Sequence, residues 1–418
     1  MFRKTKIVCT IGPVSESEDM LRDLIIAGMD AARLNFSHGD YNEHGEKIRL
    51  IRKLSEELDK PIAIIQDLQG PKIRVGEVEN NKIYLKDGEN IALTSKETLG
   101  NEKLLYINYP YLLQNINVGE RILIDDGAIE LKAIDKKDDK LICSIIHGGY
   151  LSNHKGVNFP DSTLKVSPLT EKDKKDVLFG IERGVDFIAL SFIQRGSDIL
   201  ELKEFLELHD ARIPVIAKIE KREAVNNFKE ILEVADGIMV ARGDLAVEMS
   251  NEEVPLIQKR IIKETRISGK PVITATQMLI SMVDNPTPTR AEVSDVANAI
   301  LDGTDAVMLS NETAAGKYPI ESVKMMDKIA RKVEEEFPFE EFLKESDSKE
   351  NITQAITFST CQIAKEIKAS AIITATHSGF TARQTSKYRP SSTIFALTPF
   401  PEIRRRLNLS WGVVPLLT

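Results

Sequence analysis

Short apolar runs alternate with longer amphipathic segments along most of the chain. Most of the short runs lack the alternating polar residues of a strand with one face in solvent, which is typical of a parallel sheet covered on both faces. Eight runs have this character, and we expect each to form a strand. They are Ile7–Cys9, Met29–Arg33, Ile62–Ile65, Phe187–Leu190, Val215–Ala217, Gly237–Val240, Val272–Thr274 and Ala306–Leu309.

Helical periodicity accompanies these runs, with one amphipathic segment for each expected strand. The segments cover residues 17–27, 43–58, 171–182, 198–208, 222–233, 253–267, 289–301 and 320–335. Because strand and helix alternate eight times, the pattern predicts an α/β protein built on a (β/α)8, or TIM, barrel.

The connection after the third strand is far longer than the others and differs in texture. Its short alternating segments, such as Arg121–Ile124 and Leu141–Ile146, are separated by Asp-Gly and Gly-Gly pairs, which is the pattern of β-hairpins. We therefore predict a small β-barrel lid domain, residues 71–165, inserted at the mouth of a catalytic barrel formed by residues 1–70 and 166–336.

A third region follows the charged stretch Glu334–Asn351. It has a helical segment at Ala355–Lys368 and strand segments at Ala371–Thr374 and Thr393–Thr398, with a glycine-bearing loop and a further helix between the strands. We expect a C-terminal α/β regulatory domain over residues 337–418.

Composition limits the class of protein. A chain of 418 residues, 42% hydrophobic and 29% charged, has room for two or three domains that each build a core. The net charge of −8 argues against general nucleic-acid binding. The three cysteines lack CxxC spacing, so neither a disulfide framework nor a zinc site is expected. The few cysteines favour the cytosol, so we expect a cytoplasmic protein. No uncharged apolar run has the ~18 residues of a membrane helix, so we expect no membrane partner.

Polar residues gather where the expected strands end, which is where a (β/α)8 barrel carries its chemistry. Lys218 and Glu220 are two residues apart, so their side chains leave the same face of one strand. Asp244 follows the next strand, and two carboxylates from neighbouring strands suit Mg2+ or Mn2+ together with substrate oxygens. Other strand ends carry Arg33, Asn35, Ser37, His38, Asp67, Arg74, Ser191, Thr276, Ser310 and Glu312. This set suggests a site for a phosphorylated, carboxylated small molecule.

Each of these signals also has a purely structural interpretation. A lysine and a glutamate in this spacing commonly form a salt bridge, and Asp244 can cap a helix. Ser310 can be an N-cap with Glu312 in the first turn, and the segment Gly70–Arg74 can be a turn with a solvated face. Their joint occurrence after eight successive strands favours the functional interpretation.

These residues lie in longer motifs through which the chain resembles pyruvate kinases. The motifs are Thr10–Pro13, Ala32–Gly39, Lys155–Asn158, Lys218–Glu220, Asp236–Leu245, Ala275–Leu279, Thr289–Glu292, Ser294–Ala299 and Asp302–Asp305. The resemblance covers essentially the whole chain. It implies a glycolytic enzyme that transfers the phosphoryl group of phosphoenolpyruvate to ADP, giving ATP and, after protonation of the enolate, pyruvate.

The resemblance also implies roles for individual residues. Glu220 and Asp244 would hold Mg2+, with Mn2+ as an alternative, and a second Mg2+ would arrive with ADP. Lys218, Arg33 and Arg74 would neutralise charge on the phosphoryl group in flight, which is the main demand of phosphoryl transfer. For substrate binding, the resemblance implies Lys218, Gly243, Asp244, Thr276 and Ser191, and for protonation it implies Thr276, Ser310 and Glu312. The nucleotide would be bound by Arg33, Pro13, His38 and Lys155. A phosphorylated effector would be bound by Thr376, Ser378 and Gly379.

Many members of the family need K+, and the resemblance places that ion at Asn35, Ser37, Asp67 and the backbone of Leu68. Those members have Glu where this chain has Lys72, and the chain is similar here to the members that need no K+. An ammonium group that reaches into the site would supply the fixed positive charge of the missing ion. We therefore expect no requirement for K+.

Two departures from the family pattern bear on these expectations. Asn311 stands where the family has Gly, which could alter the backbone beside Ser310 and Glu312. The family continues beyond the expected strand at Val413–Leu417. We therefore expect an incomplete C-terminal domain, with impaired effector activation and weakened contacts in the homotetramer that is usual in the family.

Two other functions stay open. Related barrels place two carboxylates and an arginine around Mg2+ in lyases that act on pyruvate or phosphoenolpyruvate, and dependence on ADP would separate such a lyase from a kinase. A catalytically impaired paralogue that serves as a binding or scaffold module requires the loss of catalytic residues. Lys218, Glu220, Asp244, Arg33 and Arg74 are all present.

Overall fold

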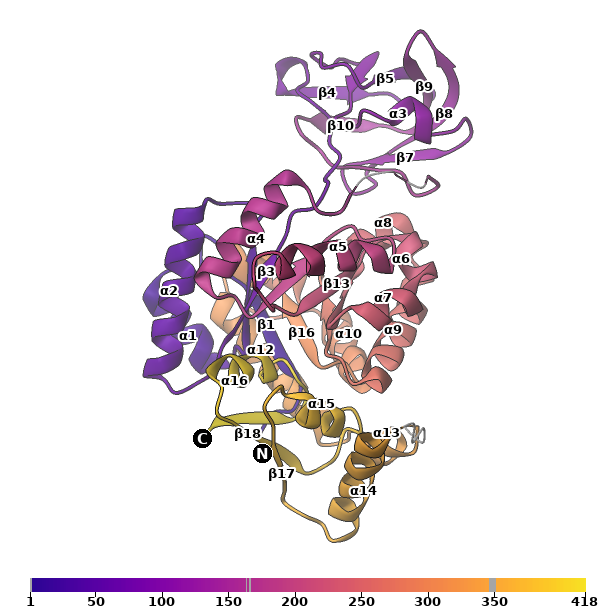
Figure 1. Ribbon diagram of the computed structural model, residues 1–418. Helices are drawn as coiled ribbons and strands as arrows, with labels where there is room; N and C mark the ends of the chain where they lie inside the picture. The colour runs from indigo at the N-terminus through magenta and orange to yellow at the C-terminus, as the bar shows by residue number, and fades with distance from the viewer. Residues whose placement is uncertain (1, 163, 165–166, 346–350) are drawn as a thin grey trace.

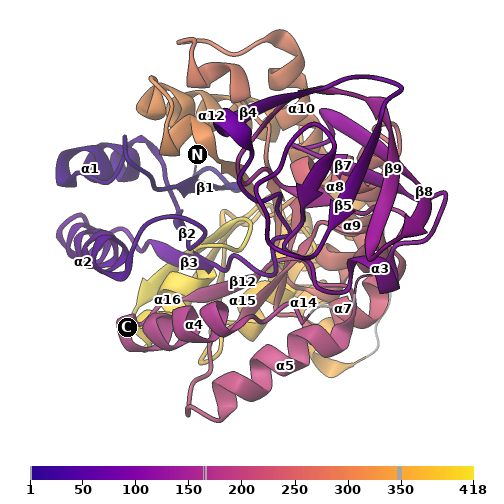
Figure 2. The ribbon, with the colours of Figure 1, turned by 90° about the horizontal axis from the view of Figure 1, so that it is seen from above.

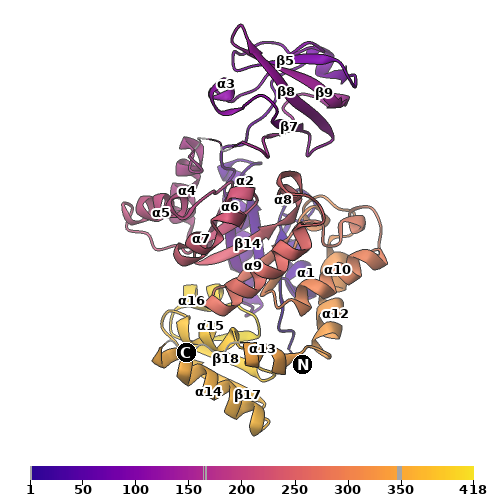
Figure 3. The ribbon, with the colours of Figure 1, turned by 90° about the vertical axis from the view of Figure 1, so that its right-hand side faces the viewer.

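The computed structural model describes residues 2–162, 164, 167–345 and 351–418. Three parts are stacked, with a β domain at one end, a barrel in the middle and an α/β domain at the other end (Figure 1). The side view in Figure 3 gives the same order, so the two outer parts lie at opposite ends of the barrel. In the described part of the chain, no helix is long and apolar enough to cross a membrane.

Eight parallel strands close the barrel in the order β1-β16-β15-β14-β13-β12-β3-β2. The strands are β1 (Lys6–Thr10), β2 (Ala31–Asn35), β3 (Ala63–Asp67), β12 (Phe187–Leu190), β13 (Val215–Ile219), β14 (Gly237–Ala241), β15 (Val272–Ala275) and β16 (Ala306–Leu309). Each coincides with one of the eight apolar runs, so the predicted barrel is confirmed. β2 begins at Ala31 rather than at Met29, because Gly28 with φ of 125° ends the preceding helix and Met29 packs into the core outside the strand.

Helices surround the barrel at the predicted places. They are α1 (Glu18–Ala27), α2 (Tyr41–Glu57), α4 (Glu171–Arg183), α5 (Gly196–Glu207), α6 (Arg222–Asn226), α7 (Phe228–Val234), α9 (Val254–Ser268), α10 (Arg290–Leu301) and α12 (Pro319–Glu334). Capping boxes at Thr170 and Thr289 set the starts of α4 and α10. The helix predicted over 222–233 is interrupted at Asn227, whose backbone leaves the helical region. Three short turns, α8 (Arg242–Glu248), η2 (Ile280–Val283) and α11 (Asn311–Ala314), follow strand ends.

The inserted β domain, called the lid below, has its own core of buried aliphatic side chains. It contains η1 (Glu79–Asn81), β4 (Lys82–Leu85), β5 (Asn90–Thr94), β6 (Leu104–Tyr106), α3 (Leu112–Asn115), β7 (Arg121–Ile124), β8 (Ile129–Lys137), β9 (Lys140–His147), β10 (Gly149–Ser152) and β11 (Val157–Asn158). Seen from above, it overlies one side of the barrel (Figure 2). The predicted lid boundary at residues 165 and 166 lies outside the described residues.

The C-terminal α/β domain is built on a parallel sheet in the order β17-β18-β19. Its elements are α13 (Phe339–Glu345), α14 (Ile352–Glu366), β17 (Ala371–Ala375), α15 (Phe380–Ser386), β18 (Thr393–Thr398), α16 (Pro401–Leu407) and β19 (Val413–Leu417). α13 lies in the charged stretch for which we predicted no helix, and residues 346–350 of that stretch are outside the described residues. The ring of Phe342 on α13 is buried against Phe337, and this contact packs α13 onto the rest of the protein.

A buried carboxylate joins this domain to the barrel. Asp305, just before β16, is 3.0 Å from the guanidinium Nη2 of Arg389. The backbone N–H groups of Trp411 and Val272 donate to its two oxygens at 3.0 and 3.1 Å. Asp305, Arg389 and Trp411 are all buried, so one carboxylate satisfies donors from both domains in a site closed to water.

Asp305→Asn should lower the free energy of unfolding by about 3 kcal/mol, because the Arg389 charge would stay buried without its counter-ion. The change is measured by urea denaturation. Asp59→Asn is the matched control, since Asp59 also pairs with an arginine of the C-terminal domain, Arg404, but its side chain is 86% exposed. We expect less than about 1 kcal/mol there. Equal effects of the two substitutions would contradict this role for Asp305.

Candidate functional site

The carboxyl ends of the barrel strands form a mouth on the side of the lid, and Lys218 on β13 is buried there. Its Nζ is 2.8 Å from Oε1 of Glu220 and 3.1 Å from Oδ1 of Asp67. The same ammonium group donates to Oγ of Ser191 at 2.7 Å. Arg33 joins through Nε, which is 2.6 Å from Oδ2 of Asp67. These five side chains form one network, called the mouth cluster.

The charges in this network support one another. Burial opposes the ammonium charge of Lys218, but Asp67 and Glu220 outweigh it and raise the pKa of Lys218 above its ordinary value. Burial also acts to raise the pKa of Asp67, yet Lys218 and Arg33 hold that pKa below its ordinary value. Lys218 and Asp67 are therefore both charged at neutral pH. Because they are buried, electrostatic interactions at this site are stronger than at the protein surface.

Glu220 and Asp244 come from neighbouring strand ends, because β13 pairs with β14. Burial raises the pKa of Glu220, and the negative charge of Asp244 adds to the rise. The backbone N–H of Phe192, a residue with φ of 57°, donates to Oε2 of Glu220 at 2.8 Å and fixes the carboxylate. Two carboxylates that repel each other fit a divalent cation, which would leave coordination positions to substrate oxygens and water.

Thr276 lies at the end of β15 with a strained backbone. Its φ is 69°, and that of Gln277 is 54°, both in the left-handed region that β-branched residues avoid. The hydroxyl Oγ1 of Thr276 accepts from the N–H of Gly243 at 2.8 Å, and its carbonyl accepts from Nη2 of Arg242 at 2.7 Å. Arg242 is itself paired with Asp295 at 2.7 Å. The strained residue is thus held from two sides beside Asp244.

Ser310 and Glu312 lie at the end of β16. Glu312 is fully buried, and its oxygens accept from the backbone N–H groups of Ser310 at 2.7 Å and Leu279 at 3.1 Å. The hydroxyl of Ser310 is buried and has no hydrogen-bond partner among the described residues. Asn311 opens α11 without a positive φ, so this position does not need the glycine of the family pattern.

Arg74 lies apart from the mouth cluster. Its backbone forms a bridge with Gly156, and its Nη1 donates to the carbonyl of His154 at 2.8 Å, both in the lid. Lys155, beside them, pairs with Asp125 at 2.9 Å. β3 ends at Asp67, and Arg74 lies in the segment 71–165 that we predicted to form the lid, so it reaches the strand ends from the lid and not from β3 itself.

The residues expected around K+ lie beside the mouth cluster. Asp67 already has two cationic partners, and the carbonyl of Leu68 accepts from Oγ of Ser191 at 2.7 Å. The side-chain oxygen of Asn35 accepts from the N–H of Ser37 at 3.1 Å. These oxygen atoms are therefore engaged by protein donors.

The remaining predicted residues lie around the cleft and in the C-terminal domain. Lys72 is exposed and lines the cleft between lid and barrel together with Asp244. Pro13 and His38 are exposed and follow β1 and β2. The predicted effector loop is distant in the fold: Thr376 follows β17, Ser378 accepts from Arg383 through its carbonyl at 3.2 Å, and Gly379, with φ of 78°, precedes α15.

Two family models match this chain, one over the barrel with its inserted lid and one over the C-terminal domain. Residues 2–323 match the model "Pyruvate kinase, barrel domain", and residues 354–418 match "Pyruvate kinase, alpha/beta domain". The chain belongs to the pyruvate kinase family. It is a phosphotransferase of that family, whose members use a divalent metal.

Individual relatives agree with this assignment. The pyruvate kinase of Geobacillus stearothermophilus is 52% identical over 99% of this chain and 71% of its own length. Pyruvate kinase 2 of Synechocystis is 51% identical, with the same coverage. The crystal structure of a pyruvate kinase from Cryptosporidium parvum superposes with a TM-score of 0.96 at 38% identity, covering 100% of this chain and 87% of that one.

One residue of this candidate site has no signal in the sequence. Phe192 acts through its backbone N–H on Glu220, and only its positive φ, which no residue pattern reveals, marks it. Arg242, which lies in the motif Asp236–Leu245, holds the carbonyl of Thr276, a contact that was not predicted. Asp67 and Ser191 were named, but their contacts with Lys218 were not predicted.

Glu220→Gln should weaken Mn2+ binding in the presence of phosphoenolpyruvate roughly hundredfold, because one of two negative charges beside the ion is lost. The electron paramagnetic resonance signal of free Mn2+ measures this affinity. Glu248→Gln is the control, since Glu248 is equally buried but contacts Lys221 and Asn158. If both variants bind Mn2+ as the wild type does, the ion is held elsewhere.

Proposed function

We propose that the protein transfers the phosphoryl group of phosphoenolpyruvate to ADP at the mouth cluster, giving pyruvate and ATP. The observation that carries the proposal is the position of Lys218, a fully charged ammonium group between two carboxylates at the end of β13. Phosphoryl transfer depends chiefly on positioning and charge neutralisation. A phosphoryl group that replaces one carboxylate keeps Lys218 neutralised throughout the transfer.

Arg33 on β2 also serves charge neutralisation. Its Nη1 donates to Oγ1 of Thr10 at 3.0 Å, and its Nε to Asp67, so the plane of the guanidinium is fixed before substrate binds. A fixed guanidinium can bind two phosphoryl oxygens together. Asp67 then positions both Arg33 and Lys218. This role is separate from the K+ site at which the family resemblance places Asp67.

Glu220 and Asp244 would hold Mg2+, or Mn2+, next to the substrate. When bound, the ion neutralises negative charge on the phosphoryl and carboxylate oxygens. The raised pKa of Glu220 and the negative charge of Asp244 beside it support this assignment. The amides of Gly243 and Asp244 complete the proposed carboxylate site, although the amide of Gly243 is bound to Thr276 without substrate.

The proton for the enolate comes, in this proposal, from the side of Thr276, Ser310 and Glu312. The strained backbone of Thr276 supports a site kept for a transferred proton or a water molecule, as does the hydroxyl of Ser310, which has no hydrogen-bond partner among the described residues. Arg74 has to leave the carbonyl of His154 to reach the phosphoryl group, so we propose that lid movement delivers it. ADP lies between Lys155 of the lid and the barrel residues Pro13, Arg33 and His38.

Lys218→Met tests the proposal by the rate of pyruvate formation from phosphoenolpyruvate, ADP and Mg2+. We expect kcat to fall about thousandfold, because the charge on the phosphoryl group loses its buried partner. Lys47→Met is the control. Lys47 is a buried lysine on α2, and its Nζ is 2.9 Å from Oε2 of Glu16. This variant should form pyruvate at the rate of the wild type. Product formed without ADP would instead indicate the lyase, and an unchanged rate in Lys218→Met would contradict the mechanism.

We further propose that the enzyme needs no K+. The engaged oxygen atoms of Asp67 and Leu68 support this, as does an ammonium group at Lys72 without an ion-pair partner among the described residues. The rate should change less than about twofold when K+ replaces tetramethylammonium at constant ionic strength. Lys72→Glu should make the rate depend on K+. A strong rise with K+ in the wild type would refute the proposal.

Effector binding at Thr376, Ser378 and Gly379 and assembly into a homotetramer remain proposals of the family resemblance. Exposed apolar residues on one side of α14, Ile352, Ile356 and Ile363, with Ile367 just after its end, support association through the C-terminal domain.

A further inference from the structure

A cavity of about 220 Å3 lies between the barrel and the C-terminal domain, at the end of the barrel opposite the mouth. Three cationic side chains line it. Lys270 comes from the loop before β15, Arg383 from α15 and Arg406 from α16. We call this the floor cavity. Its cations therefore reach it from both domains.

None of these cations has a carboxylate partner within ion-pair distance in the described part of the chain. Arg383 donates one hydrogen bond, to the carbonyl of Ser378 at 3.2 Å, and Arg406 donates one, to the carbonyl of Arg212 at 3.1 Å. Lys270 donates to two carbonyls at the end of α7. Backbone carbonyls satisfy single N–H groups but do not neutralise a positive charge.

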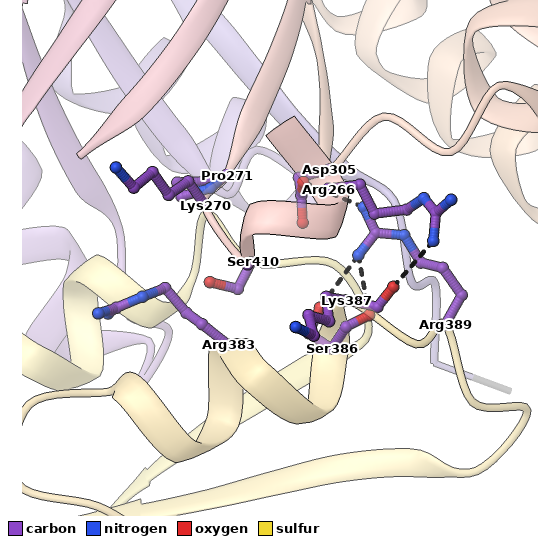
Figure 4. Close-up of a pocket in the computed structure, with 10 residues that line it drawn as sticks. Arg266, Lys270, Pro271, Asp305, Arg383, Ser386, Lys387, Arg389 and Ser410 are labelled. Atoms are coloured by element: carbon purple, nitrogen blue, oxygen red, sulfur yellow. Dashed lines mark hydrogen bonds and ion pairs between the residues drawn. The ribbon is translucent and has the colours of Figure 1, made fainter. Parts of the chain in front are cut away.

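The acidic group in the lining is already engaged. Asp236 pairs with Lys203 at 2.9 Å. Asp305, which does not line the floor cavity, accepts from Arg389, Trp411 and Val272. Figure 4 shows Lys270 above and Arg383 below extending to the same side, away from the group of Asp305 and Arg389. The cavity therefore keeps an excess of positive charge.

Burial makes this arrangement costly without an anion. It lowers the pKa of Arg383, of Arg406 and of Lys270, because partly desolvated cations lose hydration. The Nε of Arg406 is also buried, with no hydrogen-bond partner in the described part of the chain. Buried unpartnered donors on converging cations are expected where a ligand completes the site.

The walls of the floor cavity favour an anion that carries an organic group over a free inorganic anion. Apolar side chains of Phe187, Phe380 and Ile403 line the cavity beside the hydroxyl-bearing residues Ser268 and Ser410. Guanidinium groups bind phosphate oxygens in pairs, and a phosphate monoester carries close to two negative charges at neutral pH. We propose that the floor cavity binds a small organic phosphate monoester, whose phosphate is held by Lys270, Arg383 and Arg406.

Occupancy would link the two domains, since Lys270 belongs to the barrel and the two arginines to the C-terminal domain. Arg383 donates to the carbonyl of Ser378 in the predicted effector loop. A ligand that binds Arg383 would therefore change the contacts of that loop. The site does not depend on catalysis, and its test uses no turnover.

Isothermal titration with inorganic phosphate and with glucose 6-phosphate tests the site in the intact protein. Saturating pyruvate and Mg2+, which supply no phosphate monoester, keep the mouth occupied. We expect saturable binding of both probes, and about tenfold weaker binding in Arg406→Gln and in Lys270→Met, each of which removes one charged donor. Arg404→Gln is the matched control on α16, since Arg404 pairs with exposed Asp59, and it should bind as the wild type does.

Thermal denaturation in phosphate-free buffer shows whether each variant is folded before its binding is compared with that of the wild type. Arg406→Gln should be at least as stable as the wild type, because it removes a buried charge without a counter-ion. Equal binding by Arg404→Gln and Arg406→Gln, or binding of glucose as tight as that of its phosphate, would overturn the proposal. Citrate binding tighter than glucose 6-phosphate with the same dependence on Arg406 would overturn the choice of a phosphate.

Discussion

The burial of Lys218 at the end of β13 constrains the whole mouth of the barrel. A buried ammonium group is tolerated only with counter-charges close by, and here Asp67 from β3 and Glu220 from the end of β13 supply them. Asp67 in turn needs Arg33 from β2. The register of the strands therefore determines whether the charges balance, which ties the closure of the barrel to the chemistry at its end.

The two ends of the barrel treat charge differently. At the mouth, each cation of the mouth cluster faces a carboxylate, and substrate and metal would exchange with these internal partners. At the floor, Lys270, Arg383 and Arg406 meet only backbone carbonyls among the residues that the structure describes. A site that holds its own counter-ions is stable when empty, whereas the floor cavity becomes electrostatically complete only with an anion.

The strands could be predicted from sequence because they are buried on both faces, so their apolar runs are continuous. The shared face of Lys218 and Glu220 followed from the strand period. The contact of Arg33 with Asp67 could not be predicted, because it depends on the pairing of β2 with β3 and on rotamers. The direction of Arg74 depends on the position of the lid, which residue spacing does not encode.

The central claim is that Lys218 exchanges its carboxylate partner for the phosphoryl group. A crystal structure with Mg2+ and phosphoenolpyruvate measures this through the distances from Nζ of Lys218. We expect a phosphoryl oxygen within hydrogen-bond distance of Nζ, with Glu220 and Asp244 turned to the metal ion. Lys218 still bridging Asp67 and Glu220, with substrate bound elsewhere, would contradict it.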